Sequence, residues 1–226
     1  MPFNLWYQKY KVVFPKQMII KDYQLEQLIK EHSGFFGILI YGPNEGLVRE
    51  QTEKITGHFS VKNDCEIINF NGKDLDNDPL SLDDVFRTVS MFHTNKIVVA
   101  DTIKDKHIKI IEDLVLNKPQ QTILIIKDSN LNKSSKIRKF FENDKKCLSL
   151  ACYEDDGRSI MGNIDEFIKK NNFELDRDIK NYLLQSLSTD RMVSKSELEK
   201  IEIFYSKKKE KIKLSDIKTL LNDSSS

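Results

Sequence analysis

A short stretch between residues 38 and 50 constrains the fold more than any other part of the sequence. An apolar run of strand length at residues 38–41 is followed by Gly42 and Pro43, a second glycine at Gly46, and a charged segment suited to a helix. A buried strand that passes through a glycine-bounded turn into a helix is the layout of a phosphate-binding loop. The stretch therefore predicts an α/β fold built around a βα unit of the nucleotide-binding type.

The residues that perform nucleotide chemistry are missing from this loop. A working loop cradles phosphate oxygens with backbone N–H groups and a helix N-terminus, and it adds a Lys for the phosphates and a Ser or Thr for Mg²⁺. Here the second glycine falls one place early, and Leu47, Val48 and Arg49 occupy the Gly-Lys-Ser/Thr positions. Glu45 would repel phosphate. We interpret the loop as a scaffold that binds no nucleotide and no other cofactor; it comprises Gly42, Pro43, Asn44, Glu45 and Gly46.

The composition is that of a globular protein with no overall electrostatic bias. The 226 residues suffice for one large or two small domains, and 39% are hydrophobic and 31% charged. A net charge of +1 provides no long-range attraction to nucleic acid or to a membrane. No apolar run approaches the ~18 residues of a membrane span. Cys65, Cys147 and Cys152 form no CxxC pair, which indicates buried free thiols in a reducing cytoplasm.

Helices and strands alternate through the first two thirds of the chain. The periodicity predicts strands at 38–41, 65–70, 96–101, 122–128 and 147–152, with helices at 23–32, 47–59, 80–91, 107–116 and 133–141. Uniformly apolar strands that alternate with helices favour a parallel sheet covered on both faces. Beyond about residue 155 the pattern predicts only helices, at 159–171, 176–187, 196–207 and 215–221. Ser194 and Glu197 have the spacing of a capping box.

These patterns predict two domains with flanking segments. We expect residues 1–17 to be an N-terminal extension or an upstream mis-start, because Met18 and the residues after it resemble a natural start. An α/β domain is expected at 18–154 and a small helical domain at 155–222. The tail at 223–226 is polar and typical of a linker, so we expect the chain to be truncated there.

Other candidate sites have simpler structural explanations. Asp101 and Asp128 end apolar strands, as a catalytic carboxylate does in nucleotide hydrolases, but Asp101 lacks a neighbouring Glu to polarise water. The four histidines are scattered and none has a Ser or Cys nucleophile at a recognisable spacing, so we expect no catalytic site and no metal site. A basic cluster at 133–146 is interrupted by Glu142 and Asp144, which favours a solvated helix face over a DNA-binding surface.

The end of the predicted helix at 80–91 is harder to explain. Ser90, Met91, Phe92 and His93 come directly before the strand at 96–101, so two large apolar residues stand between polar ones. Such a pair suits a wedge that enters a pocket on another protein. The alternative is that both side chains pack inward, as apolar residues at helix ends often do.

Taken together, these segments resemble the family of delta subunits of the bacterial DNA polymerase III clamp loader. The resemblance covers about residues 18–223 and rests on the loop at 41–50, the segment at 90–92 before a strand, residues 151–153, and the helical stretch at 187–200. The helical stretch is the most specific, because its Asp-Arg, Ser and Glu-Leu-Glu-Lys positions match together.

The resemblance implies a RecA-like, AAA+-type parallel-sheet domain followed by an all-helical lid domain. Members of the family do not hydrolyse ATP; they bind the ring-shaped sliding clamp with a hydrophobic wedge and open it for loading onto primed DNA. The family wedge Ser-Leu-Phe corresponds to Ser90, Met91 and Phe92, and exchange of Leu for Met conserves volume.

The same resemblance implies an assembly. The expected partners are the sliding clamp (the beta subunit) and the gamma/tau and delta prime subunits, with DNA contacted only through the complex. The chain would act within a cytoplasmic polymerase holoenzyme without a catalytic site of its own, and the family carries a third, C-terminal collar domain. Two alternatives stand: an active AAA+ ATPase, which needs the missing Lys and Ser/Thr, and a DNA-binding accessory module, which needs a sustained basic face.

Overall fold

The computed structural model describes residues 19–20, 36–88, 91, 93, 95–117, 122–206 and 211–222. They fall into two compact units. One unit contains the β-sheet and the helices that cover it, and extends to Ala151 without the segment Pro43–Glu50. The other contains Pro43–Glu50 together with the chain from Cys152 onward.

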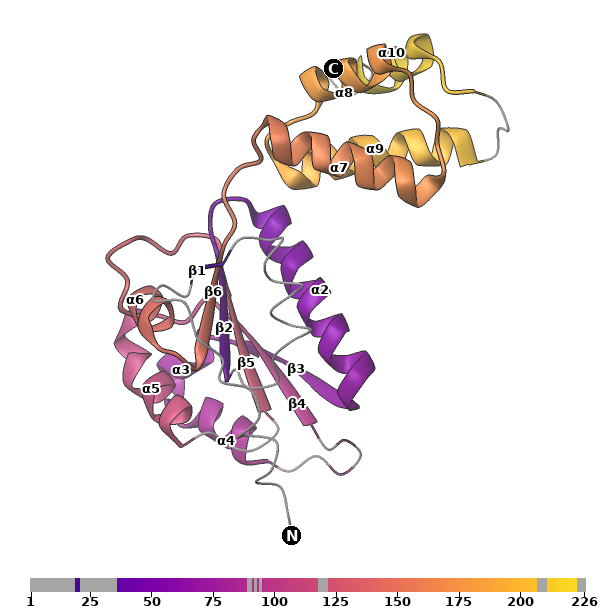
Figure 1. The fold of residues 1–226 in the computed structure, drawn as a ribbon. Coiled ribbons are helices and arrows are strands. Elements are labelled where there is room, and N and C mark those ends of the chain that lie inside the picture. The colour runs from indigo at the N-terminus through magenta and orange to yellow at the C-terminus, as the bar shows by residue number, and fades with distance from the viewer. Residues whose placement is uncertain are drawn as a thin grey trace. The chain divides into compact units, whose positions relative to one another are not determined.

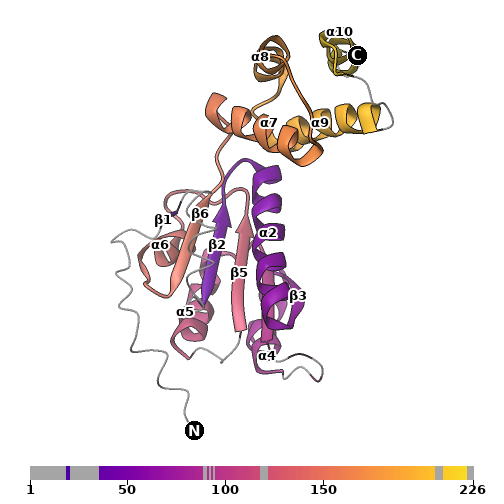
Figure 2. The same ribbon diagram turned by 45° about the vertical axis from the view of Figure 1, so that its right-hand side comes forward.

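The described strands form one parallel sheet in the order β1-β6-β2-β5-β4-β3 (Figures 1 and 2). Their bounds are β1 (Ile19–Ile20), β2 (Gly37–Tyr41), β3 (Cys65–Asn71), β4 (Asn95–Asp101), β5 (Thr122–Asp128) and β6 (Cys147–Ala151). Strand β2 is buried along its whole length, because it pairs with β5 on one side and β6 on the other. This central position explains its uninterrupted apolar sequence. The expected parallel sheet is confirmed; β1 was not expected.

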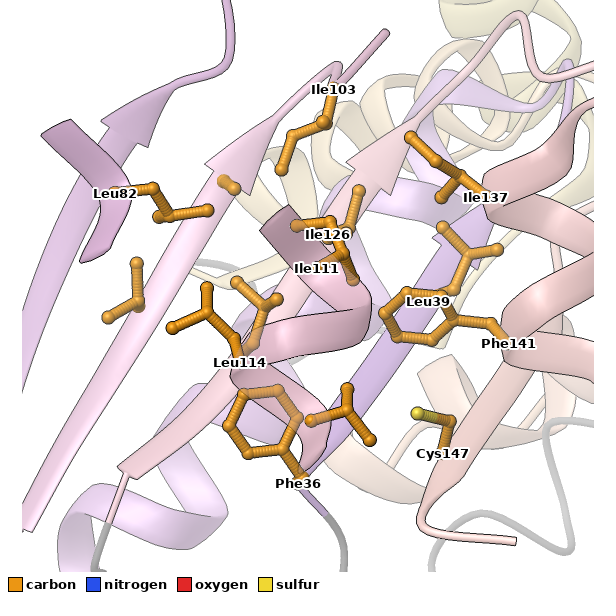
Figure 3. Packing of buried hydrophobic residues seen from close by; sticks show 14 of the residues in the cluster. Phe36, Leu39, Leu82, Ile103, Ile111, Leu114, Ile126, Ile137, Phe141 and Cys147 are labelled. Atoms are coloured by element: carbon orange, nitrogen blue, oxygen red, sulfur yellow. The ribbon is translucent and has the colours of Figure 1, made fainter. Parts of the chain in front are cut away.

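Helices line both faces of this sheet. They are α2 (Glu45–Asn63, of which the residues from Gln51 onward belong to this unit), α3 (Asp74–Asn77), α4 (Ser81–Arg87), the 3₁₀-helix η1 (Asp105–His107), α5 (Ile108–Leu116) and α6 (Lys136–Asn143). Successive residues of a strand point to opposite faces. Leu39 and Tyr41 of β2 therefore join the cluster built with α3, α4, α5 and α6, which includes Leu82, Ile111 and Phe141 (Figure 3). Helix α2 lies on the other side of the sheet from α5 (Figures 1 and 2).

Helix α4 is shorter than its sequence predicts. The apolar spacing predicted a helix at 80–91, but α4 ends at Arg87 and Thr88 has extended angles, φ −63° and ψ 125°. The Lys96 ammonium group donates hydrogen bonds to the Val85 and Thr88 carbonyl oxygens at this end of the helix. These carbonyl groups therefore have partners although the helix does not continue. Met91 therefore lies outside the helix, in the connection to β4.

The second unit is helical, with α7 (Gly157–Asn171), α8 (Arg177–Ser186), α9 (Arg191–Ser206) and α10 (Leu214–Asn222). Its core contains one fully buried side chain from each helix: Ile164, Leu183, Ile201 and Ile217. The predicted capping box is wrong, because Ser194 lies inside α9 and its hydroxyl donates to the Ser188 carbonyl. Asp190 caps α9 instead, since its carboxylate accepts from the N–H groups of the first turn.

None of the described helices combines the length and the apolar character that crossing a membrane requires.

Candidate functional site

The turn after β2 begins with a glycine that its conformation requires. Gly42 has φ 139°, a region that side-chain-bearing residues rarely adopt, and its N–H donates to the Asp128 carbonyl over 3.1 Å. This bond joins the carboxyl ends of β2 and β5. The frame of a phosphate-binding loop is therefore present at the position that the sequence predicts.

Asn44 occupies the start of α2 as an N-cap. Its Oδ1 accepts from the Leu47 N–H over 3.1 Å, and its Nδ2 donates to the Tyr153 carbonyl over 3.3 Å. Its own N–H donates to the Cys152 carbonyl over 3.2 Å. Asn44 is 4% exposed. A buried side chain of the protein itself therefore caps the N-terminus of α2. An Asn directly before an acidic first turn is an N-cap signal in the sequence that our prediction did not use.

The backbone donors of this loop are largely used within the chain. Besides the three N–H groups of Gly42, Asn44 and Leu47, the Glu45 N–H bonds the Pro43 carbonyl and the Val48 N–H bonds the Asn44 carbonyl. Pro43 has no N–H to offer. A phosphate cradle needs several such donors turned toward the ligand. In addition, the exposed Glu45 carboxylate places negative charge in the first turn, where the helix dipole would favour a phosphate.

Gly46 marks a close approach between the loop and α9. A β-carbon at Gly46 would lie 2.5 Å from Met192 Cγ and 2.7 Å from the Met192 backbone nitrogen. The second glycine of the loop therefore allows the first turn of α2 to pack against the first turn of α9. Packing against protein explains this glycine without any ligand.

The same two helix starts are joined by a buried ion network. Arg191 Nε donates to Glu50 Oε2 over 3.0 Å, and Nη1 donates to Asp155 Oδ2 over 3.1 Å. Arg191 is 7% exposed and Asp155 is 5% exposed. Burial raises the pKa of Asp155 above its ordinary value, while the Arg191 charge opposes this shift. Sequence reasoning matched Asp190 and Arg191 to a family motif but missed the partner Glu50, which is remote in the chain.

The strand-end carboxylates have structural partners. Asp128 Oδ1 accepts from the Asn130 N–H over 2.8 Å, and burial raises the pKa of Asp128. Asp101 pairs with Lys127 over 3.2 Å. Asp105, which our prediction did not single out, accepts from the Lys136 and Ile137 N–H groups at the start of α6. The simpler interpretation of these aspartates therefore agrees with their contacts.

Two of the histidines and Arg138 of the basic cluster also have structural contacts. His107 bonds Asp76 and His93 bonds Asp64, each over 2.9 Å. Arg138 Nε donates to Glu142 over 2.7 Å, and its guanidinium lies 4.5 Å from the centre of the Tyr41 ring. Among the described residues, no group of three or more His, Cys, Asp or Glu side chains is placed to hold a metal ion.

The predicted wedge lies between α4 and β4, and only part of it falls in the described residues. Met91 is 91% exposed, the highest exposure among the large hydrophobic side chains described. Ser90 and Phe92 lie outside the described residues, so the wedge stays a prediction. The inward-packing alternative does not hold for Met91, because that side chain is in solvent.

Comparison with known proteins agrees with this arrangement. The family described as DNA polymerase III, delta subunit, matches residues 38–151, which is 114 of the 226 residues and so half of the chain. A Rickettsia prowazekii protein named "Probable DNA polymerase III subunit delta" is 27% identical over 171 residues, which are 74% of this chain and 50% of the relative. The chain thus spans about half the length of the curated relative that it matches.

Solved structures share the fold. The Bacillus subtilis DNA clamp loader delta protein is similar with a TM-score of 0.56 and 15% identity, over 88% of this chain and 61% of that one. Domain III of the Thermotoga maritima replication initiation protein DnaA is similar with a TM-score of 0.53 and 14% identity, over 89% of each chain. Both likenesses show a shared fold, in which a parallel α/β domain is followed by helices. The family match goes further, and with it the chain belongs to the DNA polymerase III delta subunit family.

Proposed function

We propose that this chain is a clamp-loader delta subunit that binds a sliding clamp through a wedge of Ser90, Met91 and Phe92 and opens the ring for loading onto primed DNA. The observation that carries the proposal is the 91% exposure of Met91 just before β4. It stands within residues 38–151, the part of the chain that matches the delta family. Single exposed apolar side chains are common on protein surfaces, so the weight of Met91 comes from its place at the position of the family wedge.

The affinity would come from burial of the two apolar side chains in a pocket of the clamp. Full burial of a Met or Phe side chain is worth roughly 1.5–3 kcal/mol each. Met91 and Phe92 would act as hot spots within a wider contact whose other residues mainly exclude water. A thioether side chain adapts to pockets of different shape, so Met91 suits the place of the family Leu.

Ring opening would follow from differential affinity. A partner that binds the open clamp more tightly than the closed clamp shifts the equilibrium toward the open form by the ratio of the two affinities. The chain needs no reaction of its own for this role. Polymerase activity would belong to the holoenzyme, in which the chain contributes binding and no catalytic site.

The loop at 42–46 supports a role without nucleotide. The N–H groups of Gly42, Asn44 and Glu45 bond within the chain. Asn44 caps the start of the helix, and Gly46 packs on Met192. We expect ATP or ADP at millimolar concentration with Mg²⁺ to leave the thermal midpoint unchanged. A ligand at 100 times its Kd would stabilise the fold by about 2.7 kcal/mol, so a clear rise in the midpoint would revive the ATPase alternative.

The assembly is likewise part of the proposal. The α/β domain, proposed at 18–154, would present the wedge, and the helical domain, proposed at 155–222, would act as the lid. The gamma/tau and delta prime subunits would be the partners in a cytoplasmic complex, and DNA would be met through that complex. Within the basic cluster, Arg138 is engaged by Glu142 and Tyr41, which leaves one fewer cation for a DNA-binding module.

The decisive experiment compares binding to the cognate sliding clamp. The chain and its Met91→Ala/Phe92→Ala variant are titrated against the immobilised clamp, with Ile203→Ala as the control. Ile203 is 71% exposed on α9, so its replacement also removes an exposed apolar side chain, far from the wedge in the sequence. We expect tight binding by the chain and by the control and a loss of at least about 100-fold in the wedge variant.

Equal binding by all three proteins would refute the wedge. Ring opening is read separately, from energy transfer between two dyes that flank one interface of the clamp. We expect the chain to lower the transfer efficiency and the wedge variant to leave it unchanged. Tight binding with unchanged transfer would retain clamp binding and refute opening.

A further inference from the structure

A buried lysine holds the end of α4 where the connection to Met91 begins. Lys96 Nζ donates to the Val85 carbonyl oxygen over 2.6 Å and also to the Thr88 carbonyl oxygen. Its residue is 6% exposed. The last carbonyls of a helix have no partner within the helix, and a cation near a helix C-terminus interacts favourably with the dipole. Lys96 therefore satisfies both needs of this helix end at once.

Lys96 itself lies in an inner strand of the sheet. It is the second residue of β4, where it pairs with Glu66 of β3 and Thr122 of β5, so hydrogen-bonded strands flank it on both sides. The Thr88 N–H and hydroxyl both bond the Asp84 carbonyl, over 2.9 Å and 2.7 Å. The exit of the chain from α4 is thus tied to the sheet through one side chain.

A second and weaker tie lies beyond Met91. His93 Nδ1 and Asp64 Oδ1 are 2.9 Å apart, and their side chains are 40% and 67% exposed. Exposed pairs of this kind contribute little, because water screens them. Of the two ties, the buried lysine is therefore the one that fixes the geometry.

We propose that Lys96 is a positioning residue for the contact that Met91 makes with its partner, an inference that rests on the clamp-binding function proposed above. Lys96 does not touch the partner in this scheme. It holds the end of α4 at Thr88, three residues before Met91, so that the exposed Met91 side chain is presented in one place. When only a fraction of molecules is competent to bind, the apparent Kd rises by the inverse of that fraction.

The test uses Lys96→Met, which keeps the length of the side chain and removes its charge and donors. Lys109→Met is the matched control, because Lys109 is an exposed lysine on α5 of the same unit. We expect Lys96→Met to weaken binding of the cognate sliding clamp about tenfold and the control to leave it unchanged. Without clamp, amide hydrogen exchange of the peptide that covers α4 should become faster in Lys96→Met and stay unchanged in the control.

A double-mutant cycle separates positioning from general stability. In the Met91→Ala background, Lys96→Met should cause little further loss of affinity, because the positioned side chain is already gone. An equal loss in both backgrounds would overturn the proposal, and so would wild-type affinity or wild-type exchange in Lys96→Met. If Met91→Ala alone binds the clamp like the wild type, the assignment of Met91 to the wedge fails instead. The exchange result, obtained without clamp, then still decides whether Lys96 holds the end of α4.

Discussion

Arg191 donates to both carboxylate oxygens of Glu50, a residue 141 positions earlier in the chain, over 3.0 Å and 3.4 Å. The same guanidinium donates to Asp155, so one cation serves two carboxylates in the interior of the helical unit. The pairing joins the second turn of α2 to the first residue of α9. This ion pair between residues far apart in the sequence stabilises the start of α2 without any ligand.

We predict that Arg191→Met destabilises the helical unit by about 3 kcal/mol, because removing one partner leaves buried carboxylates without their counter-charge. The measurement is urea unfolding followed by circular dichroism at 222 nm. Lys180→Met is the control, since it breaks an exposed pair with Asp165 and should change stability by less than ~0.5 kcal/mol. Equal midpoints for the two variants would show that the Arg191 network adds no more than a surface pair.

Two glycines of α2 should respond oppositely to alanine. Gly46→Ala would place a β-carbon 2.7 Å from the backbone nitrogen of Met192, so we expect a loss of about 1–3 kcal/mol through overpacking. A β-carbon at Gly57 meets nothing within 4 Å, and Ala is the better helix former by about 1 kcal/mol. Gly57→Ala should therefore raise the thermal midpoint where Gly46→Ala lowers it. A neutral Gly46→Ala would contradict the close approach of the loop to α9.

The stability contributed by Asp76 should depend on pH in a defined direction. Hydrogen bonds from His107, Lys104 and Lys106, in that order, lower the pKa of Asp76 well below its usual range. A carboxylate whose folded-state pKa is lowered stabilises the fold above its unfolded pKa of about 3.9, and this stabilisation is lost as pH falls through the lower folded value.

Asp76→Asn should therefore unfold at a lower urea concentration than the wild type at pH 7, and the gap should narrow progressively below about pH 4. Asp178→Asn, which removes an exposed carboxylate from α8, is the control and should show no such narrowing. A gap of constant size from pH 7 to pH 3 would mean that the contribution of Asp76 is not ionic.

The three cysteines should differ in reactivity. All three are free; Cys147 and Cys152 are buried, whereas Cys65 is half-buried. Burial raises the pKa of both Cys147 and Cys65, by more at Cys147, and the thiolate is the reactive form. Iodoacetamide at pH 8 should label Cys65 slowly and leave the other two unmodified until urea is added, as peptide mass spectrometry can show. Prompt labelling of Cys147 in the native protein would contradict its burial.

The sheet could be predicted from the sequence because its signal is local. The strand at 122–128 was predicted with the bounds that β5 has, since a buried central strand reads as one apolar run. The loop at 42–46 was predicted for a similar reason, as its glycines have fixed places. The missing Lys and Ser/Thr are visible in the residue types alone, and the prediction that the loop binds no nucleotide rests on them.

The rest depended on contacts between distant residues. The end of α4 was misplaced because Lys96, in the next strand, replaces the helix's own hydrogen bonds. The start of α9 was misplaced because Asp190 caps the helix, while Ser194 bonds elsewhere. The pairing of Glu50 with Arg191 leaves no mark in one sequence, because each residue alone resembles an ordinary surface charge.

The hydrogen bonds of Lys96 to the end of α4 bear on how the surface around Met91 can be altered. The anchoring side chain belongs to β4 and the anchored carbonyls belong to α4, so none of the anchor is encoded by the side chain at position 91. The side chain at position 91 can therefore be replaced while the contacts of Lys96 with the end of α4 stay the same. A designer could replace Met91, leave Lys96 untouched, and so change the exposed side chain without rebuilding the fold.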